Sequence, residues 1–128
     1  MCDVAVEAMI AAIVRERFAV HLDPVNLINS VERYFDNAAL LRECFEKLGP
    51  WIRSCHAKDI ILGERLTVHL DECGPGEGAL DYATFLREVQ PLGPDVPVLI
   101  EHLKAEEEFD RAAGYIRSVA QAEGVRII

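Results

Sequence analysis

The stretch I-R-S-C-H at residues 52–56 decides the fold, because an apolar run, Ile52 to Cys55, ends there on His56, a metal-ligand type of side chain. Two other apolar runs in the chain end in the same way. They are Phe18 to Leu22 before Asp23, and Val96 to Ile100 before Glu101. A helical stretch separates each run from the next. The order of strand, ligand-type residue and helix therefore recurs three times.

This order is typical of a (β/α) barrel, in which ligands from the carboxyl ends of separate parallel strands converge on one site. A complete eight-unit barrel needs roughly 250 residues, whereas this chain has 128. The sequence therefore predicts an α/β fold, a partial (β/α) barrel with about three parallel strands alternating with helices, the barrel being incomplete. We expect residues 1–128 to form a single domain, because no linker or low-complexity segment interrupts them.

Capping residues indicate where the helices begin and end. The predicted helices run from Asp3 to about Arg17, from Asn37 to Leu48 behind Asp36, from Tyr82 to Val89 behind Asp81, and from about Ala105 to Glu123 before Gly124. The segment from Asp59 to Leu80 is rich in glycine and too long for a simple connection. We expect it to be an irregular active-site loop.

Side-chain alternation along a strand predicts which residues share a face with the three ligands. Counting back in twos pairs His21 with Asp23, Ser54 with His56 and Leu99 with Glu101. His21 and Ser54 would then lie one layer below the ligands. A hydrogen bond from that layer can fix an imidazole tautomer or orient a carboxylate.

Charge and cysteine content narrow the class of protein. The formal net charge of -9 disfavours nucleic acid and anionic membrane as partners, because both are bound through clustered Lys and Arg. The four cysteines are Cys2, Cys44, Cys55 and Cys73, without a C-x-x-C pair. A zinc site made from three of them with His69 has no recognised spacing. No signal peptide or membrane span is indicated, so we expect a cytoplasmic protein.

Asp23, His56 and Glu101 form a mixed oxygen and imidazole set. Such a set suits Mn, Mg, Co or Zn and does not select among these divalent metals. One ion held this way can polarise a sugar carbonyl and its adjacent hydroxyl. A carboxylate beside the ion is then a natural general base, because its conjugate acid can return the proton.

Four motifs in order along the chain resemble the sugar phosphate isomerase/epimerase family of xylose isomerase-like TIM barrels. They are V-H-L-D-P-V-N at residues 20–26, C-H-A-K-D at 55–59, G-E-G-A-L-D-Y at 76–82 and V-L-I-E-H-L at 98–103. These look like the sixth, seventh and eighth strand ends of that family. The resemblance thus covers the C-terminal half of such a barrel.

The resemblance implies that Asp23, His56 and Glu101 are three of the four metal ligands of the family, with Glu101 also one of its two acid/base carboxylates. The fourth ligand of the family is a glutamate on an earlier strand, and nothing before Phe18 can be that strand. We therefore expect the C-terminal portion of a metal-dependent sugar (phosphate) isomerase or epimerase, inactive by itself. The expected partners are a small carbohydrate substrate, if the barrel is completed, and either further copies of the chain in a homo-oligomer or a missing N-terminal half. Lys58 is a candidate substrate contact, although a charged residue just past a strand is usually solvated.

Two departures from the family limit what can be carried over. Asn26 stands where ketose epimerases commonly place a histidine, and residues 60–62 are Ile, Ile and Leu where they place an arginine. The identity of the sugar is therefore not carried over. The endonuclease IV type of DNA repair enzyme, which has a related barrel, needs several further histidines, and Asn26 with the histidine-poor loop from Asp71 to Gly78 argues against it.

Two further readings stay open. The Gly76-Glu77-Gly78 turn either aims backbone N–H groups at a phosphate or simply permits a tight turn, and its acidic neighbours would repel a phosphate. The whole chain could instead be a non-catalytic half-barrel that self-associates, or binds a partner chain, through exposed strand edges.

Overall fold

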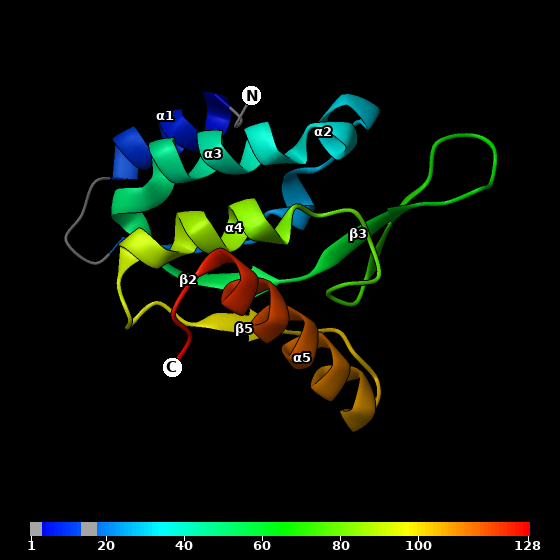
Figure 1. Cartoon of the computed structure of the whole chain (residues 1–128). Coiled ribbons are helices and arrows are strands. Elements are labelled where there is room, and N and C mark those ends of the chain that lie inside the picture. Colours follow the sequence, from blue (N-terminus) through cyan, green and yellow to red (C-terminus); the bar gives the residue numbers. More distant parts are fainter. Residues whose placement is uncertain (1–3, 14–17) are drawn as a thin grey trace.

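The computed structural model describes residues 4–13 and 18–128, and its centre is a parallel three-stranded sheet (Figure 1). The strands are β1 (Val20–Leu22), β2 (Ile52–Ala57) and β5 (Val98–Ile100), in the order β1-β2-β5. Both neighbouring pairs run parallel. The predicted fold class is confirmed: the chain forms part of a (β/α) barrel with three parallel strands.

The described helices are α1 (Val4–Ile13), α2 (Val31–Phe35), α3 (Asn37–Leu48), α4 (Tyr82–Val89) and α5 (Glu106–Glu123). All of them except α2 begin close to the cap predicted from the sequence. The side chains of Asp36 and Asp81 accept N–H groups in the first turns of α3 and α4, and Gly124 ends α5 in the left-handed region with φ of 68°. Asp3 and Arg17, the predicted ends of the first helix, lie outside the described residues. The short helix α2, capped by Ser30, was not predicted.

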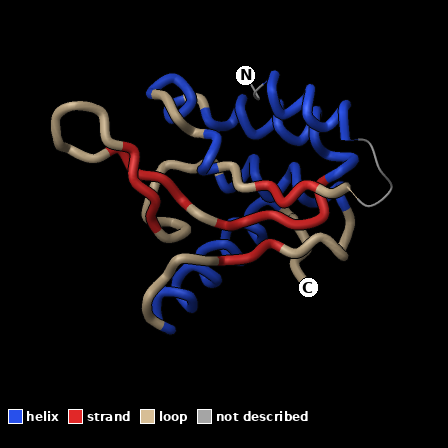
Figure 2. Tube along the Cα trace, turned by 180° about the vertical axis from the view of Figure 1, so that it is seen from behind, coloured by secondary structure: helices blue, strands red, loops and turns tan. Residues whose placement is uncertain are grey.

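Helices α3, α4 and α5 cover one face of the sheet, and the hydrophobic core lies between these layers (Figure 1). Core side chains from the strands include Leu22, Ile52, Cys55 and Ala57, and those from the helices include Leu41, Cys44, Phe85 and Ile116. The view from behind shows the strands with no described helix in front of them (Figure 2). The apolar side chain of Leu99 is 47% exposed, which is unusual in a parallel sheet, because such sheets are normally covered on both faces.

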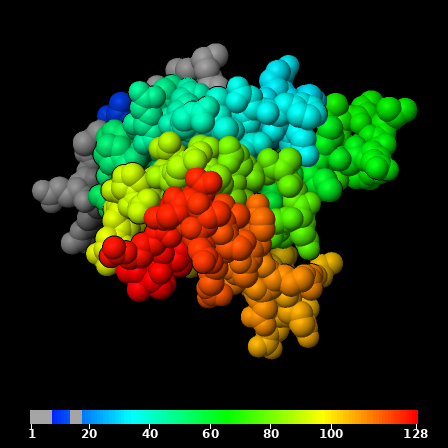
Figure 3. Space-filling model, viewed as in Figure 1, coloured from blue at the N-terminus to red at the C-terminus, as the bar shows by residue number. Residues whose placement is uncertain are grey.

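The segment from Asp59 to Leu80 differs from the irregular loop expected from the sequence. It contains an antiparallel hairpin, β3 (Asp59–Leu62) and β4 (Leu70–Cys73), in which Asp59 lies opposite Cys73 and Leu62 opposite Leu70. The hairpin continues the direction of β2 and stands out from the body (Figure 3). The prediction of irregular structure was wrong because β3 and β4 pair although neither segment shows a clear alternation of polar and apolar residues.

A buried carboxylate holds the base of this hairpin in place. Asp59 is fully buried and accepts N–H groups from Ile60 at 2.9 Å, Leu80 at 2.8 Å and Gly76 at 2.9 Å. Gly78 passes so close that a Cβ there would lie 2.3 Å from the carbonyl oxygen of Ile60 and 2.5 Å from Asp59 Oδ1. The turn after β4 is therefore tied to the start of β3, and Gly78 is required by close packing.

We expect Gly78→Ala to lower the free energy of unfolding by about 1 to 3 kcal/mol or more, because an overpacked buried site must shift backbone atoms. The matched control is Gly114→Ala in α5, where an added Cβ meets nothing within 4 Å. There alanine should stabilise the helix by up to about 1 kcal/mol. Urea unfolding of the three proteins measures both effects, and equal stability of the two variants would contradict the packing argument.

The outer edges of β1 and β5 have no partner strand among the described residues. A cavity of about 910 Å³ borders the β5 edge, lined by apolar side chains that include Val96, Val98, Ile100, Ile116 and Ile127. Unpaired N–H and C=O groups beside apolar side chains favour association with another chain. The sheet therefore leaves two edges and one face available to a partner.

We predict that the 128-residue chain self-associates, with sedimentation at micromolar concentration giving a dimer or a larger species. Leu99→Lys should weaken association, because it places a charge on the bare face of β5. Phe35→Lys is the control, since Phe35 is 74% exposed and belongs to α2 and not to the sheet. A monomer with a cooperative thermal transition at all concentrations would contradict the prediction.

Candidate metal centre

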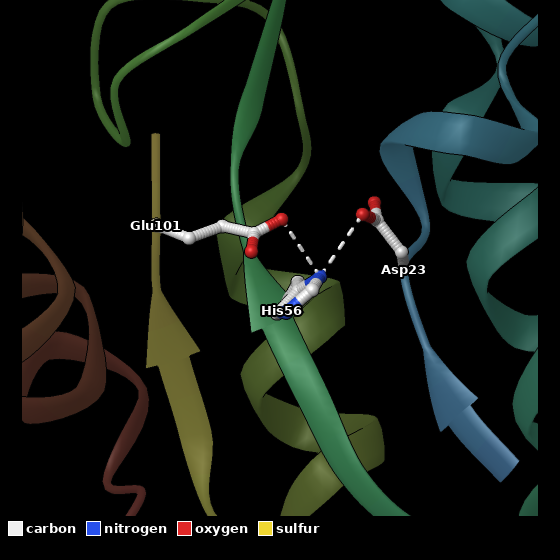
Figure 4. A group of neighbouring side chains, drawn as sticks. All are labelled: Asp23, His56 and Glu101. Atoms are coloured by element: carbon white, nitrogen blue, oxygen red, sulfur yellow. Dashed lines mark hydrogen bonds and ion pairs between the residues drawn. The ribbon is translucent and has the colours of Figure 1, made fainter. Parts of the chain in front are cut away.

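Asp23, His56 and Glu101 point toward one another at the carboxyl ends of the three parallel strands (Figure 4). Asp23 is the residue after β1, Glu101 is the residue after β5, and His56 lies near the end of β2. His56 Nδ1 lies 3.1 Å from Asp23 Oδ2 and 2.9 Å from Glu101 Oε1. The structure thus brings together the three side chains that the sequence singled out.

The turn after β1 fixes the carboxylate of Asp23. Pro24 opens a short 3-10 helix over Val25–Leu27, which returns Asn26 to the carboxylate. The Asn26 backbone N–H donates to Asp23 Oδ1 at 3.3 Å, and its side-chain amide donates to Oδ2 at 3.0 Å. Asn26, considered above only as a departure from the family pattern, therefore positions a candidate ligand.

Lys58 lies against the same carboxylates. Its ammonium is 2.9 Å from Asp23 Oδ2, 2.7 Å from Glu101 Oε1 and 3.1 Å from Glu72 Oε2 on β4. The side chain is only 4% exposed, whereas a solvated position is the usual one for a lysine just past a strand. A role of Lys58 in binding substrate remains a prediction.

Glu72 and His102 are members of this cluster that were not predicted from the sequence. His102 Nδ1 lies 2.7 Å from Glu72 Oε1, and His102 Nε2 lies 3.6 Å from Glu101 Oε1. The backbone of His102 has φ of 61°, in the left-handed region that side chains other than glycine rarely adopt. Its place directly after Glu101 was a usable signal, whereas nothing local to Glu72 indicated that the hairpin would bring it here.

Lys58 keeps both candidate carboxylate ligands ionised. Its hydrogen bond is the largest influence on Glu101 and holds the pKa of that carboxyl below the ordinary value. Burial raises the pKa of Asp23, but hydrogen bonds, the strongest from Lys58, outweigh burial and leave that pKa lowered. Burial also acts to lower the pKa of Lys58, yet its bonds to Glu101, Asp23 and Glu72 raise it above the ordinary value. Asp23, Glu101 and Lys58 are therefore all charged at neutral pH.

His21 and Ser54 lie beside His56, as the alternation predicted. His21 Nδ1 and Ser54 Oγ are hydrogen-bonded to each other. The ring of His21 meets the ring of His56 edge-on, with centroids 3.9 Å apart and an interplanar angle of 80°. The His21 ring thus packs against the His56 ring, and a role of His21 and Ser54 in orienting His56 or the carboxylates stays a prediction.

Two of the described cysteines, Cys55 and Cys73, adjoin members of this cluster in the sequence. Burial raises the pKa of Cys55 to about 12, and burial followed by the charges of Asp59, Glu77 and Glu72 raises that of Cys73 to about 12. Both thiols are therefore protonated at neutral pH, whereas a metal ligand is a thiolate. Among the residues that the structure describes, the group able to hold a metal ion contains no cysteine.

The geometry of Asp23, His56 and Glu101 fits a divalent ion. Their ligand atoms lie within 4.8 Å of one another. Metal bonds of about 2.0 to 2.3 Å place ligand atoms on one ion roughly 3 to 4.5 Å apart. Two carboxylates and an imidazole are donors that Mn, Mg, Co and Zn all accept, so the set does not choose the metal.

The chain is similar in structure to a xylose isomerase domain protein from Planctomyces limnophilus, with a TM-score of 0.68 and 19% sequence identity. The match covers 93% of this chain and 41% of that chain. The fold is that of part of a xylose isomerase-like barrel. The chain thus spans less than half the length of this relative. The sequence matches no family model and no curated protein.

None of the described helices is long and apolar enough to cross a membrane.

We predict that Glu101→Gln lowers the free energy of unfolding at pH 7 and that this difference narrows as the pH falls. Because the folded-state pKa of Glu101 is lowered from 4.5, its ionised form contributes stability above about pH 4.5, and that contribution is lost as the pH falls through the lower folded value. Urea unfolding from pH 7 to pH 3 measures the change. The control is Glu64→Gln at the exposed hairpin tip, whose free energy of unfolding should change with pH as that of the wild type does. If the stability lost in Glu101→Gln were the same at every pH, the link between Glu101 ionisation and stability would be refuted.

Proposed function

We propose that this chain is the C-terminal portion of a metal-dependent isomerase or epimerase that acts on a sugar or sugar phosphate. The observation that carries the proposal is the convergence of Asp23, His56 and Glu101 at the carboxyl ends of three parallel strands. That end of the strands is where barrel enzymes place their chemistry. The similarity to a xylose isomerase domain protein supports the same reading at the level of the fold.

In this proposal Asp23, His56 and Glu101 hold a divalent metal ion, of which Mn, Mg, Co and Zn all suit the donors. The bound ion supplies polarisation of a sugar carbonyl and the adjacent hydroxyl. Glu101 removes or returns the proton at the neighbouring carbon, and its ionised state is the one that a base requires. The backbone and side-chain hydrogen bonds from Asn26 keep the carboxylate of Asp23 in place.

A two-carboxylate mechanism needs a second acid/base group across the substrate from Glu101. In the proposal that carboxylate belongs to β/α units outside these 128 residues, on the same polypeptide or on another chain. The 128-residue chain is then inactive by itself. A cytoplasmic location and a small carbohydrate substrate belong to the same proposal.

A non-catalytic role is the second candidate, and the open edges of β1 and β5 favour it. In that role the half-barrel associates with a copy of itself or with a partner chain through these edges. The candidates differ in what they require of Glu101, because association through strand edges does not depend on its charge.

Metal binding tests the first candidate. We expect the chain to bind Mn²⁺ weakly, as measured by the electron paramagnetic resonance signal of free Mn²⁺. Glu101→Gln should weaken binding at least about tenfold, a loss of about 1.4 kcal/mol, because the neutral amide keeps the shape but loses the charge. Glu64→Gln makes the same change in net charge at the exposed hairpin tip and should bind as the wild type does.

An activity assay tests whether catalysis needs a group from outside the 128 residues. The purified chain should show no detectable epimerisation of a ketose, and a polypeptide supplying the remaining β/α units of a related barrel should restore turnover in trans. Robust epimerisation by the 128-residue chain alone, abolished by Glu101→Gln, would place the second acid/base group within the chain. Glu72, which contacts Lys58 in the same cluster, would then be the first carboxylate to replace.

A further inference from the structure

Lys58 occupies a position that a bound cation would share. Its ammonium contacts Asp23 Oδ2 at 2.9 Å and Glu101 Oε1 at 2.7 Å. These are the same two oxygens that face His56 Nδ1 at 3.1 and 2.9 Å. The ammonium and the imidazole thus lie around one pair of carboxylate oxygens, where a metal held by Asp23, His56 and Glu101 would bind.

The ammonium is held there as a complete hydrogen-bonded group. It has three N–H donors, and Asp23, Glu101 and Glu72 supply three carboxylate acceptors within 3.1 Å. The side chain is 4% exposed, so water cannot readily replace those acceptors. A buried ammonium without such partners would be strongly destabilising, and three uncompensated carboxylates would repel one another.

We propose that Lys58 is a built-in cation that competes with a divalent metal for Asp23 and Glu101. The inference rests on the proposed metal site and adds a residue that sets its affinity. Lys58 stabilises the carboxylates in the absence of metal. A metal ion that binds there must either displace the ammonium or bind against its electrostatic repulsion. Both routes make Lys58 weaken metal affinity.

Removing the ammonium has two opposing effects on metal affinity, and the larger one decides whether the affinity rises or falls. Without Lys58 the ligand carboxylates lose a group that orders them, which disfavours metal binding. They also lose a positive charge a few ångströms from the ion, and at that distance the repulsion between a divalent ion and an ammonium in a partly buried site is the larger effect. The neutral variant should therefore bind metal more tightly.

The test compares Mn²⁺ affinity and thermal stability in Lys58→Met, Lys58→Arg and Lys47→Met. Lys58→Met should bind Mn²⁺ at least about tenfold more tightly than the wild type, by the free Mn²⁺ signal. Its metal-free melting temperature should fall, and saturating Mn²⁺ should raise it by more than in the wild type. Lys58→Arg keeps the charge and should stay a weak binder. Lys47→Met, on α3, controls for net charge and should bind as the wild type does.

Lys58→Gln replaces Lys58→Met if the methionine variant does not fold. Binding by the neutral variant that is equal to or weaker than that of the wild type would overturn the competition and make Lys58 a group that positions the ligands. If neither the wild type nor any variant binds Mn²⁺ or changes its melting temperature on adding it, the metal site itself is refuted. Those two failures are distinct, because only the second removes binding from every protein.

Discussion

The parallel pairing of β1, β2 and β5 is the constraint on which the rest of the structure depends. Because the three strands run in one direction, their carboxyl ends lie together at the same end of the sheet. The register places Leu22 opposite Cys55 and His56 opposite Leu99, so the residues that follow β1 and β5 flank the end of β2. Reversing one three-residue strand would carry its ligand to the other edge, about 10 Å away at the rise of a strand. A cluster built from three separate segments is therefore a consequence of strand direction.

That convergence gathers negative charge, and Lys58 makes it compatible with folding, while the next residue, Asp59, holds the hairpin in place. Lys58 and Asp59 are both buried, and their side chains point to opposite sides of the backbone, as those of successive residues in an extended segment do. Lys58 compensates the carboxylates at the sheet edge. Asp59 accepts backbone N–H groups that hold the hairpin and the following turn. The hairpin in turn presents Glu72 to Lys58, so the site and the hairpin stabilise each other through two consecutive residues.

Local signals in the sequence were enough to predict the three strands of the parallel sheet, the main helices and the three candidate ligands. Asp36 and Asp81 cap their helices through contacts within one turn, which is why the helix starts were predictable. The hairpin and α2 were missed, since the first depends on pairing across a long connection and the second is a single capped turn. Glu72 was missed for the same reason as the hairpin, because its contact with Lys58 exists only after β3 and β4 pair. Lys58 was selected for its motif, but its burial among three carboxylates follows from tertiary packing.

The incomplete sheet also bears on the function proposed for the site. The helices cover one face, and the cluster lies at an edge of the sheet whose other face is bare (Figure 2). A sugar bound at Asp23, His56 and Glu101 would meet described side chains on one side, whereas proton transfer at both faces of a carbon needs groups on two sides. Within the part of the chain that the structure describes, the outer edges of β1 and β5 have no partner strand. In the proposed function, the β/α units that would complete the barrel are also those that would supply the second acid/base group, so closing the sheet and completing the site would be one structural requirement.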